Sequence, residues 1–142
     1  TRLGDLCLQT GNYKQAMQLR NQAYQIAPDR VDAANNLAWI LATTPIIEDQ
    51  DAIRAVQLAE QAADASEHES AGVLDTLAAA RAATGDFPRA IKDQEKAVAL
   101  VPQSQRAPFQ RRLELYRKQQ PFRLPQKPRD ESDQSQQDET PG

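Results

Sequence analysis

Residues 72–102, GVLDTLAAARAATGDFPRAIKDQEKAVALVP, constrain the fold more than any other stretch of the chain. Apolar residues recur there three and four positions apart, the spacing that places side chains on one face of a helix. One stripe is Leu74, Leu77 and Ala78, and a second comprises Phe87, Ala90, Ile91, Gln94, Ala97, Val98 and Val101, with Gln94 as its only polar interruption. The stretch therefore predicts two helices, each with one face to bury.

The residues between the two stripes predict a tight turn. Gly85 can adopt the left-handed conformation that ends a helix, and the Asp86 carboxylate can accept hydrogen bonds from free N–H groups at the start of the next helix. Pro102 closes the unit because it cannot donate a helical hydrogen bond. The stretch as a whole predicts a helical hairpin with antiparallel arms.

The same pattern of turn, core and closing residues occurs once more, 74 positions earlier. Gly11, Tyr13, Ala16, Ala23 and Pro28 match Gly85, Phe87, Ala90, Ala97 and Pro102 at that constant offset, which is two periods of 34 residues plus six. A helix-turn-helix repeat of this length, with small residues at fixed positions and a closing proline, resembles the tetratricopeptide repeat (TPR). The resemblance implies an all-α fold, a right-handed superhelix of stacked antiparallel helix hairpins that ends in a capping helix.

The resemblance divides the chain into five parts. We expect repeat 1 at 1–28 with a truncated first helix, repeat 2 at 29–68 with a long inter-helix loop, repeat 3 at 69–102, a capping helix at 103–123 and a disordered tail at 124–142. Asp29 is the expected N-cap of repeat 2, and the six extra residues lie in TTPIIEDQD at 43–51. The tail is expected to be disordered because it has no periodic apolar pattern.

Three stretches carry a narrower resemblance. NNLAWILATTP at 35–45, LDTLAAA at 74–80 and RLELYRKQQPFR at 112–123 are similar to a bacterial TPR subfamily. That subfamily occurs at the C-terminal ends of larger proteins, including membrane glycosyltransferase-like ones. Together the resemblances cover about residues 1 to 123.

Helical spacing also predicts the core-facing residues of the other helices. They are Tyr13, Ala16, Leu19, Ala23 and Ile26 in 12–27; Ala34, Leu37, Ala38 and Leu41 in the second repeat; Ile53, Val56, Ala59, Ala63 and, as an option, Leu58 in 52–65; and Phe109, Leu113 and Tyr116 in 105–119. Most of the remaining residues of 105–119 are polar or charged, which is the pattern expected of a soluble outer face on a capping helix.

Charge and composition argue against several classes of partner. The formal net charge is −3, and no basic stripe is interleaved with aromatic residues, so nucleic acid is not an expected partner. No stretch is long and apolar enough to predict direct membrane insertion. The sequence is expected to be a soluble segment of a longer protein, because it begins at Thr1 within a helical pattern, and the subfamily resemblance implies that this protein is bacterial. It does not identify a compartment.

No constellation of residues predicts catalysis. His68 lies between Glu67 and Glu69, but neighbouring residues point in different directions and no second histidine or cysteine completes a metal site. Cys7 occupies a packing position and has no histidine near it in sequence. The glycines mark helix ends and form no phosphate-binding loop. We therefore expect no enzyme activity, no cofactor and no metal.

The TPR resemblance instead implies a binding surface, because the first helix of each pair lines the concave wall of a repeat stack. In that register the wall residues are Asp5, Gln9, Asp32, Asn35, Asn36, Trp39, Thr43 and Asp75, followed by Ala79 and Ala82. Asparagine amides can hold a peptide backbone, and a tryptophan can anchor an apolar side chain.

Each of these residues also has a purely structural interpretation. Trp39 could equally pack under the 45–51 loop, and Asn35 and Asn36 could make surface or inter-repeat bonds. Some TPR proteins hold a partner's terminal carboxylate on this wall with positive residues. Those residues are absent here, and Asp5 and Asp75 would repel an anion, so this mode is not expected.

The functional prediction is a non-catalytic module that binds a peptide or protein segment on the concave face. The alternatives are self-association, continuation of upstream repeats, or a domain that positions a larger enzyme such as a membrane glycosyltransferase-like protein. Enzyme activity of a longer host protein, assayed with and without this segment, would distinguish the last of these.

Overall fold

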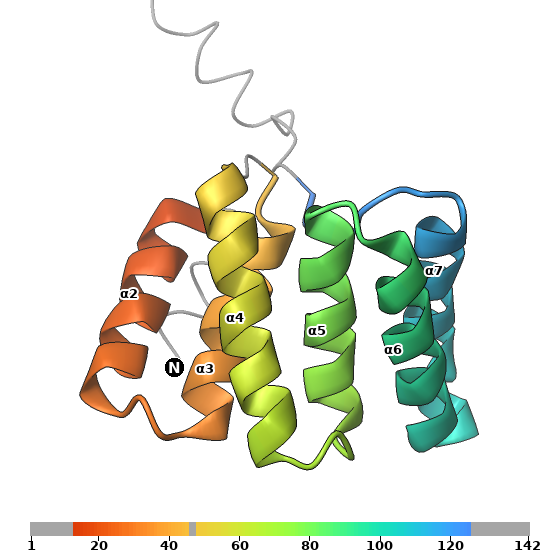
Figure 1. Ribbon diagram of the computed structural model, residues 1–142, viewed down its shortest axis with the longest axis horizontal. Helices are drawn as coiled ribbons and strands as arrows, with labels where there is room; N and C mark the ends of the chain where they lie inside the picture. Colours follow the sequence, from red (N-terminus) through yellow and green to blue (C-terminus); the bar gives the residue numbers. More distant parts are fainter. Residues whose placement is uncertain (1–12, 46–47, 126–142) are drawn as a thin grey trace, which may run out of the picture.

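The computed structural model describes residues 13–45 and 48–125 of the 142-residue chain. These residues form only helices and connecting segments, which confirms the all-α prediction for this part of the chain. The helices are α2 (Tyr13–Ile26), α3 (Val31–Thr43), α4 (Asp49–Ala65), α5 (Ala71–Ala83), α6 (Phe87–Leu100) and α7 (Arg106–Arg117), with a short 3-10 helix, η1 (Gln103–Gln105), before α7. Figure 1 shows the helices following one another along the molecule, from α2 at one end to α7 at the other.

The internal similarity of the sequence is visible in the helices themselves. Tyr13, the first described residue of α2, and Phe87, the first residue of α6, are the matched pair 74 positions apart. Ala16 and its counterpart Ala90 are both fully buried. Arg20 and Gln94, which also differ by 74, are both buried polar residues. The two helices therefore share a burial pattern as well as a sequence pattern.

Sequence neighbours pack as pairs, and the pairs pack on one another. α3 contacts α2, α4 and α5, while α5 contacts α3, α4 and α6, and α6 contacts α7. Every residue of α5 from Val73 to Ala80 is buried, because helices surround it. Alanine dominates the core, and many alanines in α3, α4 and α5 are wholly inaccessible. Small side chains let these helices approach closely.

The predicted turn chemistry of the last hairpin is confirmed. Gly85 has a φ of 86°, the left-handed conformation that a residue without a Cβ adopts at low cost. The Asp86 side chain caps α6 by accepting a hydrogen bond from the Arg89 N–H at 3.4 Å. The prediction of Asp29 as the N-cap of α3, in contrast, is wrong. The cap position is Arg30, and no side-chain capping bond forms there.

Burial confirms most predicted core residues and corrects two. Ala34, Leu37, Ala38 and Leu41 of α3 are buried, as are Leu58, Ala59 and Ala63 of α4 and Leu113 and Tyr116 of α7. Ile26 is 84% exposed and Ile53 is 56% exposed, so both inward assignments are wrong. Ile26 is the last residue of α2. Ile53 faces solvent because α4 packs against α3 and α5 through a stripe of alanines, Ala52, Ala55 and Ala59.

Two predicted boundaries also change. α4 begins at Asp49, three residues before the predicted start at Ala52, which shortens the inter-helix loop. The predicted disordered tail includes Leu124, but Leu124 packs against the core cluster formed mainly by α3, α4 and α5. Several predicted features lie outside the described residues. They are the first helix expected within 1–10, the loop residues Ile46 and Ile47, and the tail at 126–142. None of the described helices is both long and apolar enough to cross a bilayer.

Candidate functional site

A buried carboxylate joins three helices at the C-terminal half of the molecule. Asp75 of α5 accepts hydrogen bonds through Oδ1 from Gln94 Nε2 at 2.9 Å and from Arg112 Nε at 2.8 Å. Its Oδ2 accepts from Arg112 Nη2 at 2.9 Å, so the arginine binds it in bidentate fashion. Gln94 Nε2 also donates to the carbonyl of Phe109 at 3.0 Å. α5, α6 and α7 are thereby held in one arrangement.

Three aromatic rings surround the Arg112 guanidinium. Its Cζ lies 5.6 Å from the centroid of Trp39, 5.0 Å from that of Phe109 and 5.4 Å from that of Phe122. These distances fall within the range of cation–π attraction. Trp39 and Phe122 also contact each other directly, with centroids 5.7 Å apart. The guanidinium thus connects α3 and α7 to the segment that follows α7.

That segment, residues 121–125, lies across the end of α3. The last carbonyls of a helix have no partner within the helix. Here Leu124 N–H donates to Thr43 O at 2.7 Å, and Arg123 Nη1 donates to Ala42 O at 2.8 Å. Partial burial lowers the pKa of Arg123 from its ordinary value. The Tyr13 hydroxyl of α2 donates to the carbonyl of Pro125. We call residues 121–125 the docked segment.

The docked segment changes the surroundings of three predicted wall residues. Thr43 is fully buried, and its hydroxyl donates to Trp39 O at 2.6 Å. Asp75 is buried and bound by Arg112 and Gln94. Trp39 is partly buried, and its ring contacts that of Phe122. Its alternative position under the 45–51 loop stays a prediction, because Ile46 and Ile47 lie outside the described residues. The expectation that Thr43 and Asp75 line an open wall is therefore corrected, because α7 and the docked segment cover them.

The other predicted wall residues lie apart from this cluster. Asp32 and Asn36 line a second pocket of about 400 Å³ between α2 and α3. Asp32 is exposed and paired with Arg30, whose hydrogen bond lowers the pKa of the carboxyl. Asn35 Oδ1 is buried and has no hydrogen-bond partner among the described residues. Asp5 and Gln9 lie outside the described residues.

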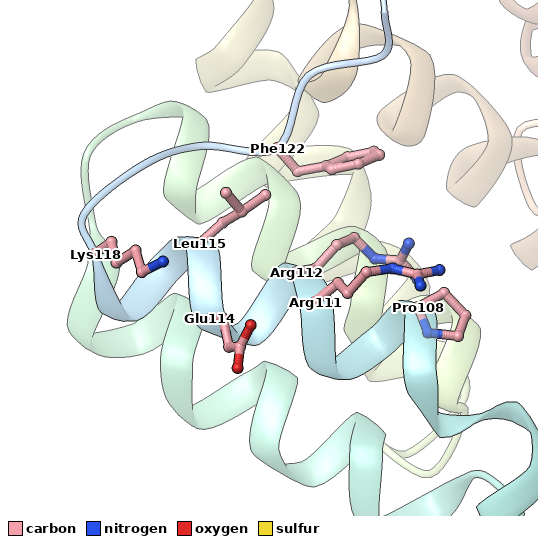
Figure 2. Close-up of a pocket in the computed structure, with 7 residues that line it drawn as sticks. All are labelled: Pro108, Arg111, Arg112, Glu114, Leu115, Lys118 and Phe122. Atoms are coloured by element: carbon pink, nitrogen blue, oxygen red, sulfur yellow. The ribbon is translucent and has the colours of Figure 1, made fainter.

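An open pocket of about 510 Å³ lies on α7 beside the docked segment. The described residues that line it are Pro108, Arg111, Arg112, Glu114, Leu115, Lys118 and Phe122. Figure 2 shows Phe122 facing α7, with the long side chains of Arg111 and Arg112 reaching in the same direction from the helix. Arg112, which also lines the pocket, and Trp39 both contact the ring of Phe122. The predicted residues Trp39 and Asp75 are therefore not among the described residues that line this pocket, but each contacts one that does.

Sequence reasoning misses most of the pocket. The pattern of a capping helix places Arg112 on the soluble outer face, but its side chain is only 14% exposed and pairs with Asp75. One signal does exist, because Gln94 interrupts an otherwise apolar stripe, and a polar residue in such a position needs a buried partner. Phe122, directly after Pro121, is expected to fold back onto the final hairpin, and it does pack against the cluster formed by α5, α6 and Tyr116. No local signal marks its contact with Trp39, which lies 83 positions earlier.

No protein-family model and no curated protein matches this sequence. The TPR assignment therefore stays a prediction.

The described residues contain no group of three or more histidine, cysteine, aspartate or glutamate side chains arranged to hold a metal ion. His68 Nε2 lies 3.0 Å from Asp64 Oδ1 on the molecular surface, an ordinary local pair at the end of α4. Cys7 lies outside the described residues. The side chains that line the α7 pocket offer charge and apolar contact.

The buried hydroxyl of Tyr116 gives a testable prediction. Tyr116 is fully buried, and its hydroxyl has no hydrogen-bond partner among the described residues. Burial, and secondarily the charge of Asp75, raise the Tyr116 pKa well above its ordinary value of 10.0. Tyr116→Phe should leave stability at neutral pH unchanged or raise it by up to about 1 kcal/mol, because it removes a desolvated polar group.

The pH dependence follows from the direction of that pKa shift. Above pH 10 the unfolded chain releases the tyrosine proton and the folded chain keeps it, so ionisation favours unfolding. Ionisation of Tyr116 therefore leaves stability unaffected below pH 10 and lowers it as pH rises above 10, with a slope approaching about 1.4 kcal/mol per pH unit. Urea unfolding at alkaline pH should show this loss in the native chain and not in Tyr116→Phe. Tyr24→Phe, which removes a surface hydroxyl bonded to Gln61, is the control and should retain the loss.

Proposed function

We propose that this chain is a non-catalytic protein-interaction module of the TPR type, which binds a segment of a partner protein in the α7 pocket. The observation that carries the proposal is the construction of the pocket. Its wall residue Phe122 comes from a segment without helix or strand, yet it is held against Trp39 and Arg112. A surface pocket with a supported aromatic wall is suited to receive a partner side chain.

The TPR part of the proposal rests on how the helices pair. α3 packs with α4 and α5 packs with α6, while α3 and α5 also contact each other. This is the contact pattern expected when hairpins stack and the first helices form an inner wall. On the same helix-pairing pattern, the proposal includes a right-handed superhelix. The inner wall of repeats 2 and 3 then continues into α7 and the docked segment.

The rigidity of the pocket favours binding. A wall that is ordered before the partner arrives does not have to be ordered during binding, which lowers the entropic cost. Here the main-chain bond from Leu124 to Thr43 and the bond from Arg123 to Ala42 fix the segment on the end of α3. Phe122 is then presented in one position, as an aromatic anchor is in many protein interfaces.

Selection from a library of random peptides displayed on phage tests the proposal with the full chain as bait. Peptides selected on the native chain should lose about tenfold or more in affinity for Phe122→Ala, because an aromatic wall of the pocket is removed. Affinity is measured by the fluorescence of Trp39, the only tryptophan in the chain, which contacts Phe122.

Phe87→Ala is the matched control. Phe87 packs against the same small cluster as Phe122, yet it does not line the pocket. Circular dichroism would establish that both variants remain folded. Equal loss of peptide affinity in the two variants, or selected peptides that bind Phe122→Ala as well as the native chain, would contradict the proposed site.

Self-association is the second candidate function, and the α2 end of the molecule favours it. Ile26 is 84% exposed and lines the second pocket together with Ala23, Ala27 and Ala33. An apolar side chain beside a pocket is a surface that a second copy could cover. Sedimentation of the full chain over a range of concentrations decides this, and a constant monomeric mass would reject stable self-association.

A further inference from the structure

The α7 pocket concentrates positive charge on an acidic chain. The chain carries a formal net charge of −3, but α7 and the residue after it contain Arg106, Arg111, Arg112, Arg117 and Lys118 against a single acidic residue, Glu114. Arg111, Arg112, Lys118 and Glu114 line the pocket. The local charge of the pocket is therefore opposite in sign to that of the molecule, and it attracts negatively charged groups.

Two of the cations that line the pocket are available to a partner. Arg112 is committed to Asp75, and Arg106 Nε donates to the carbonyl of Val101 at 3.1 Å. Arg111 and Lys118 are exposed, and neither forms an ion pair with any carboxylate in the described part of the chain. Both charges can thus be paired without breaking an existing ion pair. They lie about two helical turns apart on α7, a separation that suits an extended segment and not a single small ion.

Apolar side chains line the pocket beside the cations. Leu115 lies between Arg111 and Lys118 on the helix, Phe122 lies next to it, and Pro108 lies beyond Arg111. An arginine can pair with a carboxylate in bidentate fashion, and a lysine can pair with it as a point charge. An apolar or aromatic side chain of the same ligand would contact Phe122 and Leu115.

We infer that the partner segment is acidic and carries an apolar side chain between its carboxylates. The inference rests on the proposed function and specifies the class of ligand for the same pocket. The carboxylates pair with Arg111 and Lys118, and the apolar side chain packs between Leu115 and Phe122. Glu114 also lines the pocket and repels carboxylates. It therefore disfavours a ligand with carboxylates along its whole length and favours one whose acidic groups lie at the two cationic ends.

The test uses synthetic peptides of one length and one apolar content that differ only in charge. The acidic peptide has aspartate and glutamate flanking a leucine and a phenylalanine. Its analogues replace the acidic residues by asparagine and glutamine, or by lysine. Fluorescence anisotropy of the labelled peptides with the full chain should show binding of the acidic peptide, weaker binding of the neutral one and none of the basic one. Affinity should fall as salt is raised, because exposed charges are screened.

Charge reversal locates the interaction. The double variant Arg111→Glu, Lys118→Glu should weaken acidic-peptide binding by about tenfold or more. The double variant Arg117→Glu, Lys92→Glu is the control of equal charge change, because Arg117 and Lys92 are exposed and neither lines the pocket. It should change affinity by less than about threefold. Equal losses in both variants would overturn the inference, since they would reflect only the overall charge of the chain.

Three other outcomes would also overturn the inference. Tighter binding of a single-stranded nucleic acid of the same charge would assign the pocket to phosphates. Equal binding of the neutral peptide would show that charge plays no part, while loss of that binding in Phe122→Ala would leave the proposed function standing. Acidic-peptide binding that appears only after Asp130, Glu131, Asp133, Asp138 and Glu139 are changed to amides would assign the pocket to the chain's own acidic segment.

Discussion

Substitution of Asp75 by alanine is expected to lower the free energy of unfolding by about 3–5 kcal/mol. The side chains of Asp75 and Arg112 are 9% and 14% exposed, and the bidentate pair is the main compensation for burying the guanidinium. Removing the carboxylate leaves that charge desolvated and leaves Gln94 Nε2 with only the Phe109 carbonyl. Urea unfolding followed by circular dichroism measures the loss.

Two further variants separate the charge effect from a packing effect. In Asp75→Asn combined with Arg112→Met, no uncompensated charge remains and the introduced amide can still accept a hydrogen bond from Gln94, so part of the lost stability should return. Asp32→Ala removes a carboxylate of the same residue type from an exposed pair with Arg30 and should have a much smaller effect. If Asp75→Ala is no more destabilising than Asp32→Ala, the network does not hold α7 in place.

Enlarging a buried alanine is the second large perturbation. Ala59 of α4 is fully inaccessible within the main core cluster, so Ala59→Leu must push α4 away from its neighbours or force strained rotamers. We expect a loss of about 1–3 kcal/mol in the free energy of unfolding. Thermal and urea unfolding of the variant measure it.

Ala65→Leu provides the comparison within the same helix. Ala65 is the last residue of α4 and is exposed, so the larger side chain meets solvent. Its effect should stay within about 0.5 kcal/mol. If Ala59→Leu were tolerated as well as Ala65→Leu, close approach of the helices would not depend on small side chains.

The two perturbations address different parts of the molecule. Ala59 tests the hairpin stack, which sets the positions of α3 and α5. Asp75 tests the attachment of α7, on which the pocket depends. If Asp75→Ala abolishes peptide binding while the hairpin stack stays folded, the pocket depends on the attachment of α7 and not on the hairpin stack alone.

Local patterns in the sequence are sufficient to predict the helices. Periodicity places the core residues of α3 and α7, and Gly85 and Asp86 mark the turn between α5 and α6, because these features depend on residues within a few positions of one another. The 74-residue offset predicts that α2 and α6 are equivalent, and the shared burial of Ala16 and Ala90 agrees with it. Ile26 and Ile53 are wrongly predicted to face the core. Which face of α2 or α4 is buried depends on the position of the neighbouring helix, which the helix's own periodicity does not encode.

The candidate site cannot be predicted in the same way. An all-helical chain with hairpin turns and a basic last helix follows from the order of the amino acids. The contacts of Phe122 with Trp39, of Leu124 with Thr43 and of Arg112 with Asp75 follow only from how the helices pack in three dimensions. These contacts join residues 37 to 83 positions apart. No local spacing encodes them, because they form only when separate helices bring unpaired carbonyls, a buried carboxylate and aromatic faces to the same place.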